Sequence, residues 1–272
     1  MTWVGVCQLG GDDAPVERAW ARLCDSAATA PSEVLVLPEM CFAPWLAASP
    51  RVSATAWDEA VAAHEMWLAR LHELGAAVVV TSVPVIDEGR RYNEAVVWVA
   101  GQGIVARRRK TFLPDEPGFY EASWYERGPV SFESARTPLA TLGVLVCTEV
   151  WFGEHARGYG RHGVELLAVP RATPFGSLHR WEAACRVAAI NAGAYCLSSN
   201  RSGSQGEVTF GGGSWIISPE GEILARTTAD APIATVAVDL EAAATAKRTY
   251  PRYVDDSPPA DNGGPVQADG SG

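Results

Sequence analysis

Short apolar runs rich in β-branched residues alternate along this chain with longer segments of helical periodicity. The apolar runs predict strands at residues 4–6, 34–37, 77–83, 94–99, 104–108, 142–146, 165–169, 194–198, 215–218 and 233–238. Amphipathic spacing predicts helices at residues 14–28, 57–74, 154–161 and 178–191. Alternation of this kind favours an α/β fold in which helices cover layered sheets.

Turn-forming residues mark several of the predicted boundaries. We expect Pro38 to stop the strand at 34–37, and Gly75 to end the helix at 57–74. The sequence Gly-Gln-Gly at 101–103 lies between two of the predicted strands and indicates a hairpin.

The chain shows no internal linker and no repeat. With 272 residues and 47% hydrophobic content it is long enough to bury a large core. Residues 1–254 therefore form one predicted domain. Residues 255–272 are rich in Pro, Gly, Asp and Ser and are predicted to form a disordered tail.

The charge balance bears on the partners of the protein. The chain has 22 basic and 32 acidic residues, a formal net charge of −10, so we expect no nucleic acid and no membrane partner. The N-terminus resembles no signal peptide, and no apolar run is long enough to cross a bilayer. Six scattered cysteines without a CxxC pair indicate reduced thiols in a cytoplasmic protein.

Three chemically reactive residues each follow a predicted strand: Glu39, Lys110 and Cys147. Functional groups in open α/β sheets collect beyond the carboxyl ends of strands. Taken singly, each residue also has a structural interpretation. Cys147 could be a small buried hydrophobic residue, Glu39 a solvated loop carboxylate, and Lys110 part of a charged strand edge.

Taken together, the three residues lie in ordered sequence blocks: Pro-Glu-Met at 38–40, Arg-Lys-Thr-Phe-Leu-Pro at 109–114 and Val-Leu-Val-Cys-Thr-Glu at 144–149. This order resembles the carbon–nitrogen hydrolase (nitrilase) superfamily, and its amidase or N-carbamoyl hydrolase branch in particular. Further similar blocks lie at 120–128, 151–157, 169–172, 199–201, 210–214 and 218–222. The resemblance covers residues 3–254, nearly everything but the predicted tail.

The resemblance implies a four-layer αββα sandwich, a mechanism without a cofactor, and a homodimer or higher homo-oligomer. It makes Cys147 the nucleophile, Glu39 the base, and Lys110 with the backbone N–H of Thr148 the groups that stabilise developing negative charge. Glu121 would orient Lys110 or the substrate. A free thiol has a pKa of about 8.5, so it needs such a base, and an adjacent ammonium would favour the thiolate.

The implied reaction is hydrolysis of a non-peptide C–N bond in a linear amide or N-carbamoyl compound. A cysteine acyl-thioester would form, and ammonia or an amine would leave. Two alternatives stay open: a nitrilase that converts a nitrile to an acid and ammonia, and a non-catalytic nitrilase-like binding protein.

Some residues near the nucleophile depart from the family pattern, among them Glu149, Gly153 and Arg171. We expect Arg171 to shape the substrate pocket with Thr148, Trp151 and Phe175, and to meet a substrate carboxylate. An equally open alternative is that Arg171 makes a structural ion pair.

Other kinds of site find little support in the sequence. His155, His162 and His179 stand in no recognisable partner motif for a cysteine protease. No HExxH or paired-cysteine pattern indicates a metal site, so we predict none. The run Gly211-Gly212-Gly213 lacks the flanking residues of a phosphate loop, and we expect it to let the backbone approach the wall of the active site.

Overall fold

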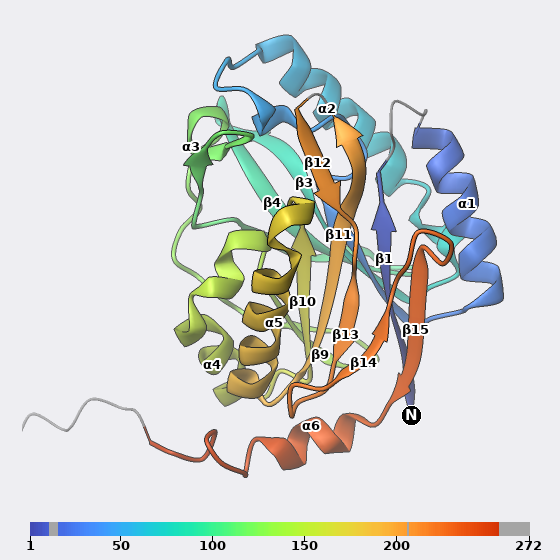
Figure 1. The fold of residues 1–272 in the computed structure, drawn as a ribbon, viewed down its shortest axis with the longest axis vertical. Coiled ribbons are helices and arrows are strands. Elements are labelled where there is room, and N and C mark those ends of the chain that lie inside the picture. Colours follow the sequence, from blue (N-terminus) through green and yellow to red (C-terminus); the bar gives the residue numbers. More distant parts are fainter. Residues whose placement is uncertain (11–15, 206, 256–272) are drawn as a thin grey trace, which may run out of the picture.

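The computed structural model describes residues 1–10, 16–205 and 207–255, and two large β-sheets form the middle of the molecule (Figure 1). The first sheet has the order β15-β1-β2-β3-β4-β5. Its strands are β1 (Thr2–Leu9), β2 (Val34–Glu39), β3 (Val78–Asp87), β4 (Arg90–Val99), β5 (Gly103–Arg109) and β15 (Ile233–Val238).

The second sheet has the order β8-β9-β10-β11-β13-β14. Its strands are β8 (Ala135–Arg136), β9 (Thr141–Val144), β10 (Leu166–Arg171), β11 (Tyr195–Gln205), β13 (Trp215–Ile217) and β14 (Ile223–Arg226). The two sheets join where Gln8 and Leu9 of β1 pair with Asn200 and Arg201 of β11. The far end of β11 also pairs with β12 (Val208–Gly211).

Successive side chains of each strand point to opposite faces of its sheet. Val34 and Val36 of the first sheet share one buried cluster with Leu142 and Val144 of the second, so the inner faces of the two sheets pack together. Outward-facing residues of the first sheet, such as Leu35, pack against α1 (Val16–Thr29) and the end of α2 (Ala54–Leu68). Outward-facing residues of the second sheet pack against α4 (Gly153–Arg161) and α5 (Leu178–Ala192).

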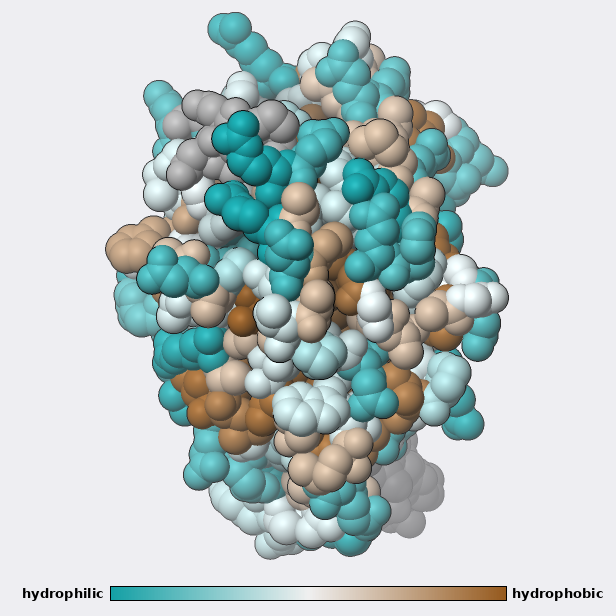
Figure 2. Space-filling view, turned by 90° about the vertical axis from the view of Figure 1, so that its right-hand side faces the viewer, coloured by the Kyte–Doolittle hydropathy of each residue, from teal (hydrophilic) through white to brown (hydrophobic). Residues whose placement is uncertain are grey.

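Helices therefore cover the outer face of each sheet, with α1 on one side of the molecule and α4 and α5 on the other (Figure 1). This arrangement confirms the predicted αββα sandwich. On the face that carries α1, apolar residues form separate patches among hydrophilic ones, as Figure 2 shows.

Parallel pairing sets the position of the candidate site. Strands β1, β2 and β3 run parallel, and so do β9, β10 and β11. The carboxyl ends of these strands therefore lie at one edge of each sheet, where functional groups can converge.

Several element boundaries differ from the predicted ones. Strand β2 continues through Pro38 to Glu39, and its pairing with β3 shifts register between Val36 and Glu39 because proline has no N–H for the ladder. The helix predicted at 57–74 is divided into α2 and a 3₁₀ turn η2 (Leu71–Leu74), which Gly75 ends with a φ of 68° as expected.

Short elements escaped the sequence analysis because each has too few residues to show a period. They are β6 (Asp115–Glu116), β7 (Phe119–Tyr120), α3 (Glu121–Trp124), β8, β12, β14, α6 (Leu240–Ala246), η1 (Leu46–Ala48), η3 (Cys147–Trp151) and η4 (Phe175–Ser177).

Apart from Asp255, the predicted tail at 255–272 lies outside the described residues. Within the described ranges, no helix combines the length and the apolar composition that crossing a membrane requires.

Candidate active site

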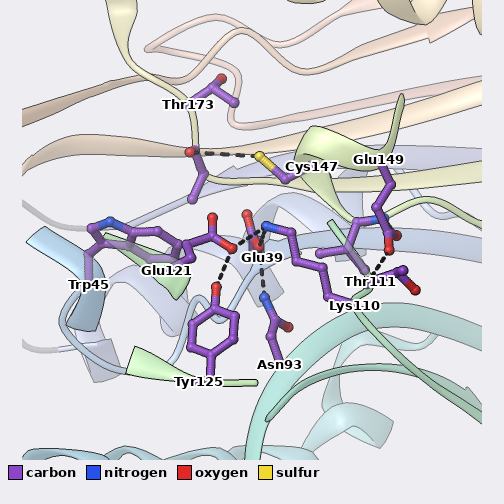
Figure 3. A network of polar contacts seen from close by, with 12 residues as sticks. Glu39, Trp45, Asn93, Lys110, Thr111, Glu121, Tyr125, Cys147, Glu149 and Thr173 are labelled. Carbon is purple, nitrogen blue, oxygen red and sulfur yellow. Dashed lines mark hydrogen bonds and ion pairs between the residues drawn. The ribbon is translucent and has the colours of Figure 1, made fainter. Parts of the chain in front are cut away.

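The ammonium group of Lys110 lies buried between two carboxylates (Figure 3). Its Nζ is 2.8 Å from Oε1 of Glu39 and 2.5 Å from Oε2 of Glu121. All three residues are 0% exposed. Buried charges of this kind require partners, and the structure provides them within one cluster.

Three different elements bring these side chains together. Glu39 is the last residue of β2, Lys110 follows β5, and Glu121 begins the short helix α3. Further donors fix the carboxylates: Asn93 Nδ2 donates to Glu39 Oε1 at 2.8 Å, and the hydroxyl of Tyr125 donates to Glu121 Oε2. The second oxygen of each carboxylate, Glu39 Oε2 and Glu121 Oε1, is buried without a hydrogen-bond partner among the described residues.

The cluster keeps Lys110 charged. Burial alone would lower the pKa of Lys110, but the carboxylates of Glu121 and Glu39 outweigh it and raise the pKa above its ordinary value. Burial raises the pKa of Glu121 to about 7, with Lys110 opposing the shift and Glu39 adding to it. One ammonium thus bonds to two carboxylates, Glu39 and Glu121.

Cys147 lies at a sharp turn after β9. Its φ of 49° is in the left-handed region, which only Met40 and Glu88 share among the described non-glycine residues. Met40 directly follows Glu39, so strained backbone accompanies two of the candidate catalytic residues. Cys147 follows a strand as predicted, although β9 ends at Val144, two residues earlier than predicted.

The sulfur of Cys147 lies beside the Glu39–Lys110–Glu121 cluster (Figure 3). Its Sγ is 3.9 Å from the carbonyl oxygen of Ala172, and the residue is 3% exposed. Burial raises the pKa of the thiol, Glu39 raises it further, and Lys110 lowers it without compensating. Lys110 thus acts in the expected direction, but burial has the larger effect and favours the thiol form of Cys147, so attack by the sulfur calls for a base.

A small pocket of about 250 Å³ opens onto Cys147. Its wall includes Thr148 and Trp151, as predicted, together with Pro114, Glu116, Phe119, Glu121, Ala172, Pro174, Ser177, Arg180 and Trp181. Phe175 does not line the pocket; it is 68% exposed, although its neighbour Pro174 does contribute. The pocket suits a small molecule with its reacting carbon next to the sulfur.

Arg171 does not reach this pocket. Its guanidinium is buried and donates to Ser198 Oγ at 2.6 Å, Thr173 Oγ1 at 2.7 Å and the carbonyl oxygen of Gly213 at 3.0 Å. It also lies over the ring of Trp215, 4.1 Å from the centroid. The geometry therefore fits a structural role for Arg171 and not contact with the substrate. Arg171 fills this role through hydrogen bonds and not through the ion pair that was the alternative.

The profile of the family described as carbon-nitrogen hydrolase matches residues 3–248. The chain belongs to this family.

Among curated relatives, the chain is 34% identical to a glutamine-dependent NAD(+) synthetase of Rhodobacter capsulatus over 183 residues, 65% of this chain and 32% of that one. It is 33% identical to an N-carbamoylputrescine amidase of Oryza sativa subsp. japonica, over 49% of each chain. These matches thus span about a third and about half of the length of the two relatives.

Solved structures of similar fold include a carbon-nitrogen hydrolase from Helicobacter pylori G27. It has a TM-score of 0.82 and 26% identity, over 92% of this chain and 94% of that one. An amidase from Nesterenkonia sp. AN1 has a TM-score of 0.73 and 21% identity, over 86% of this chain and 89% of that one, and at this identity it shows the fold alone.

Sequence reasoning missed several residues of this family member's site. Asn93 and Tyr125 support the carboxylates, and Glu149 holds the turn at Cys147: its Oε2 accepts the N–H of Val146 at 2.7 Å. Arg180 and Glu116 line the pocket. The Asn93–Glu39 contact joins residues 54 positions apart, so no local pattern marks it, and the short contacts of Tyr125 and Glu149 form within turns that show no periodicity.

Two further predictions concern metal binding and the glycine run at 211–213. Among the described residues, no group of three or more His, Cys, Asp or Glu side chains is arranged to hold a metal ion. Gly212 and Gly213 adopt φ angles of 56° and 63°. A Cβ on Gly212 would lie 2.6 Å from Oε1 of Gln8, so the glycine run allows close backbone packing, but against β1.

Proposed function

We propose that this protein is a cysteine-dependent amidase that hydrolyses the C–N bond of a small amide or N-carbamoyl compound. One observation carries the proposal: a buried carboxylate–ammonium–carboxylate cluster borders the same small pocket as a cysteine held in a left-handed turn. Such a cluster can take and return a proton beside a nucleophile while a fixed positive charge remains in place.

The first step is removal of the thiol proton. Glu39 is the base, because both of its donors, Lys110 and Asn93, bond to Oε1 and leave Oε2 free. As the proton moves to Glu39 Oε2, the sulfur of Cys147 attacks the carbonyl carbon and a C–S bond forms. Transfer during attack suits a thiol whose pKa burial has raised.

Negative charge then develops on the carbonyl oxygen. We propose that Lys110 and the backbone N–H of Thr148 stabilise this charge. Lys110 remains protonated, and Thr148 directly follows Cys147 in the wall of the pocket. A single donor of this kind is worth roughly 10²–10³ in rate.

Collapse of this intermediate breaks the C–N bond. Glu39 gives its proton to the departing nitrogen, so ammonia or an amine leaves and an acyl-thioester remains on Cys147. A water molecule then attacks the thioester and gives a proton to Glu39. Cleavage of the C–S bond releases the acid, or a carbamate from a carbamoyl group, and the proton returns to sulfur.

The names of the relatives support amide or carbamoyl substrates. They include N-carbamoylputrescine amidases and an ω-amidase of Xenopus tropicalis, which is 29% identical over 66% of this chain. Attack on a nitrile would use the same thiol and base, so nitrile hydrolysis is the second candidate.

Ammonia release tests the proposal across linear amides, N-carbamoyl amines, N-carbamoyl amino acids, ω-amides and nitriles. We expect turnover of at least one amide or carbamoyl compound, a mass increase on Cys147 corresponding to the acyl group, and loss of both in Cys147→Ala. Cys24→Ala is the matched control, because Cys24 is a partly exposed thiol on α1, remote from the pocket. Normal turnover in Cys147→Ala would overturn the assignment, and turnover of nitriles alone would favour the second candidate.

The same proposal extends to the whole chain. We propose that residues 1–254 act as one catalytic domain in a cytoplasmic homodimer or higher homo-oligomer. The family profile, which ends at residue 248, supports the domain boundary. Light scattering on the purified protein measures the oligomeric state, and a monomer at micromolar concentration would contradict it.

A further inference from the structure

Two opposite charges line the pocket without partners. Glu116 of β6 and Arg180 in the first turn of α5 both border it, and both are exposed. Within the part of the chain that the structure describes, neither makes an ion pair or a side-chain hydrogen bond, and they do not pair with each other. Exposed charges usually gain little from pairing within a protein, but a ligand can use both.

Glu182 does not neutralise Arg180. Residues two apart on a helix point to different sides, and the Glu182 carboxylate pairs with Arg186 at 3.0 Å and with Arg226 at 2.7 Å. The guanidinium of Arg180 keeps its planar set of donors, which matches a carboxylate in two parallel hydrogen bonds.

Glu116 is held on a supported hairpin. It pairs with Phe119 across β6 and β7, and the carbonyl oxygen of Gly118 in the turn accepts the indole N–H of Trp45 at 2.9 Å. The neighbouring Asp115 accepts the hydroxyl of Ser123 at 3.1 Å, so Glu116 is the carboxylate of this hairpin that borders the pocket.

Between these charges and Cys147, much of the wall is apolar and aromatic. Trp151 and Trp181 meet edge to face at 5.4 Å, and Phe119 adds a third ring. The volume of about 250 Å³ equals that of roughly eight water molecules at about 30 Å³ each. A substrate therefore needs a short aliphatic segment between its reacting group and any charged end.

We propose that Glu116 and Arg180 form a distal subsite for the zwitterionic end of an amino acid, so that the substrate is the ω-amide of an α-amino acid. The inference rests on the proposed function, since the amide group must lie at Cys147. Arg180 binds the α-carboxylate and Glu116 binds the α-ammonium. A carboxylate and an ammonium on one carbon satisfy both side chains at once, whereas a singly charged substrate would satisfy only one.

Four primary amides of nearly equal length isolate the two charges. L-glutamine carries both, glutaramate the carboxylate only, 4-aminobutanamide the ammonium only, and butyramide neither. We expect kcat/KM to be highest for glutamine and lowest for butyramide. Each charge should contribute about five- to twentyfold, because pairing at a partly exposed rim is weaker than in a buried site.

Two variants connect each charge to its residue. Arg180→Gln should lower kcat/KM about tenfold for glutamine and glutaramate and leave the other two amides within twofold. Glu116→Gln should do the same for glutamine and 4-aminobutanamide. Arg18→Gln on α1 and Glu59→Gln on α2 are the controls for the change in net charge, since both residues are exposed and neither lines the pocket.

Binding to Cys147→Ala separates this subsite from catalysis. Calorimetry with glutamine should show binding that weakens about tenfold when Arg180→Gln or Glu116→Gln is added. Equal turnover of glutamine and butyramide, or an equal loss on all four amides in Arg180→Gln, would overturn the subsite while the amidase stands. Glutamine binding through both residues, with no turnover of any amide or carbamoyl compound in the panel, would overturn the amidase and keep the subsite.

Discussion

The side chain of Glu149 accepts the backbone N–H of Thr111 at 2.7 Å. Thr111 directly follows Lys110, and Glu149 lies two residues after Cys147. The other carboxylate oxygen accepts the N–H of Val146, the residue before Cys147, at 2.7 Å. One buried carboxylate therefore ties the chain segment of the ammonium to the segment of the thiol.

This relationship predicts a large effect of Glu149→Ala. Glu149 also pairs with Arg108, whose side chain is 10% exposed, so the substitution leaves a buried charge and two backbone donors without their acceptor. Breaking one side of a buried ion pair costs about 3–5 kcal/mol. We expect a loss of that order in the free energy of unfolding, measured by urea denaturation, and a lower kcat.

The double variant Arg108→Met, Glu149→Ala provides the control for this prediction. It should recover part of the stability, because no unpaired guanidinium remains, but little of the activity, because both backbone contacts stay lost. Glu59→Ala, an exposed change, should shift stability by less than about 0.5 kcal/mol. A stable and fully active Glu149→Ala protein would contradict this role.

Glu39→Gln should remove the base and alter the pH dependence. We expect kcat to fall by about 10²–10⁴ at neutral pH. The residual reaction then depends on preformed thiolate. Because burial raises the pKa of Cys147, the thiolate fraction, and with it the rate, should rise about tenfold per pH unit between roughly pH 7 and 9. Single-turnover acylation across this range gives the profile, and one that runs parallel to that of the parent enzyme would argue against Glu39 as the base.

The proton affinity of Glu121 predicts how stability depends on pH. Its pKa is raised from 4.5 to about 7 by burial, so the folded state binds this proton more tightly than the unfolded chain. The contribution of Glu121 to the free energy of unfolding is therefore greatest below pH 4.5. It falls as the pH rises to about 7 and is then constant.

Comparison with Glu121→Gln isolates this contribution. Between about pH 5 and 7, the free energy of unfolding of the parent should fall relative to that of the variant. Above about pH 7 the difference between them should stay constant. Urea denaturation at several pH values gives the difference. A difference that is independent of pH across this window would mean that Glu121 is ionised throughout.

The sequence predicted the architecture because periodicity is a local property. The alternating valines and leucines of β2 determine which side chains face the other sheet and which face α1, and the ordered blocks located Glu39, Lys110 and Cys147 at strand ends. Boundaries were less well predicted where a specific contact decides them. Strand β9 stops early because the turn at Cys147 begins there.

Side-chain direction at the pocket could not be predicted in the same way. Arg171 and Arg180 are both arginines near the nucleophile in the fold, and sequence alone favoured Arg171. In the structure the side chain of Arg171 points into the protein, where it donates hydrogen bonds to Ser198 and Thr173, whereas Arg180 lines the pocket. That difference depends in large part on Ser198 of β11 and on the carbonyl oxygen of Gly213, which lie 27 and 42 residues further along the chain and which no local pattern encodes.

Arg171 and Arg180 should therefore respond oppositely to substitution. Arg171→Lys keeps the charge, but a single ammonium cannot reach the three acceptors and the Trp215 ring that the planar guanidinium contacts. We expect about 2–3 kcal/mol of lost stability, because buried acceptors go unpaired. The ratio of kcat/KM for glutaramate to that for butyramide should not change, whereas Arg180→Gln should lower that ratio with little effect on stability. A changed ratio in Arg171→Lys, measured at a temperature where the variant is folded, would return Arg171 to the substrate site.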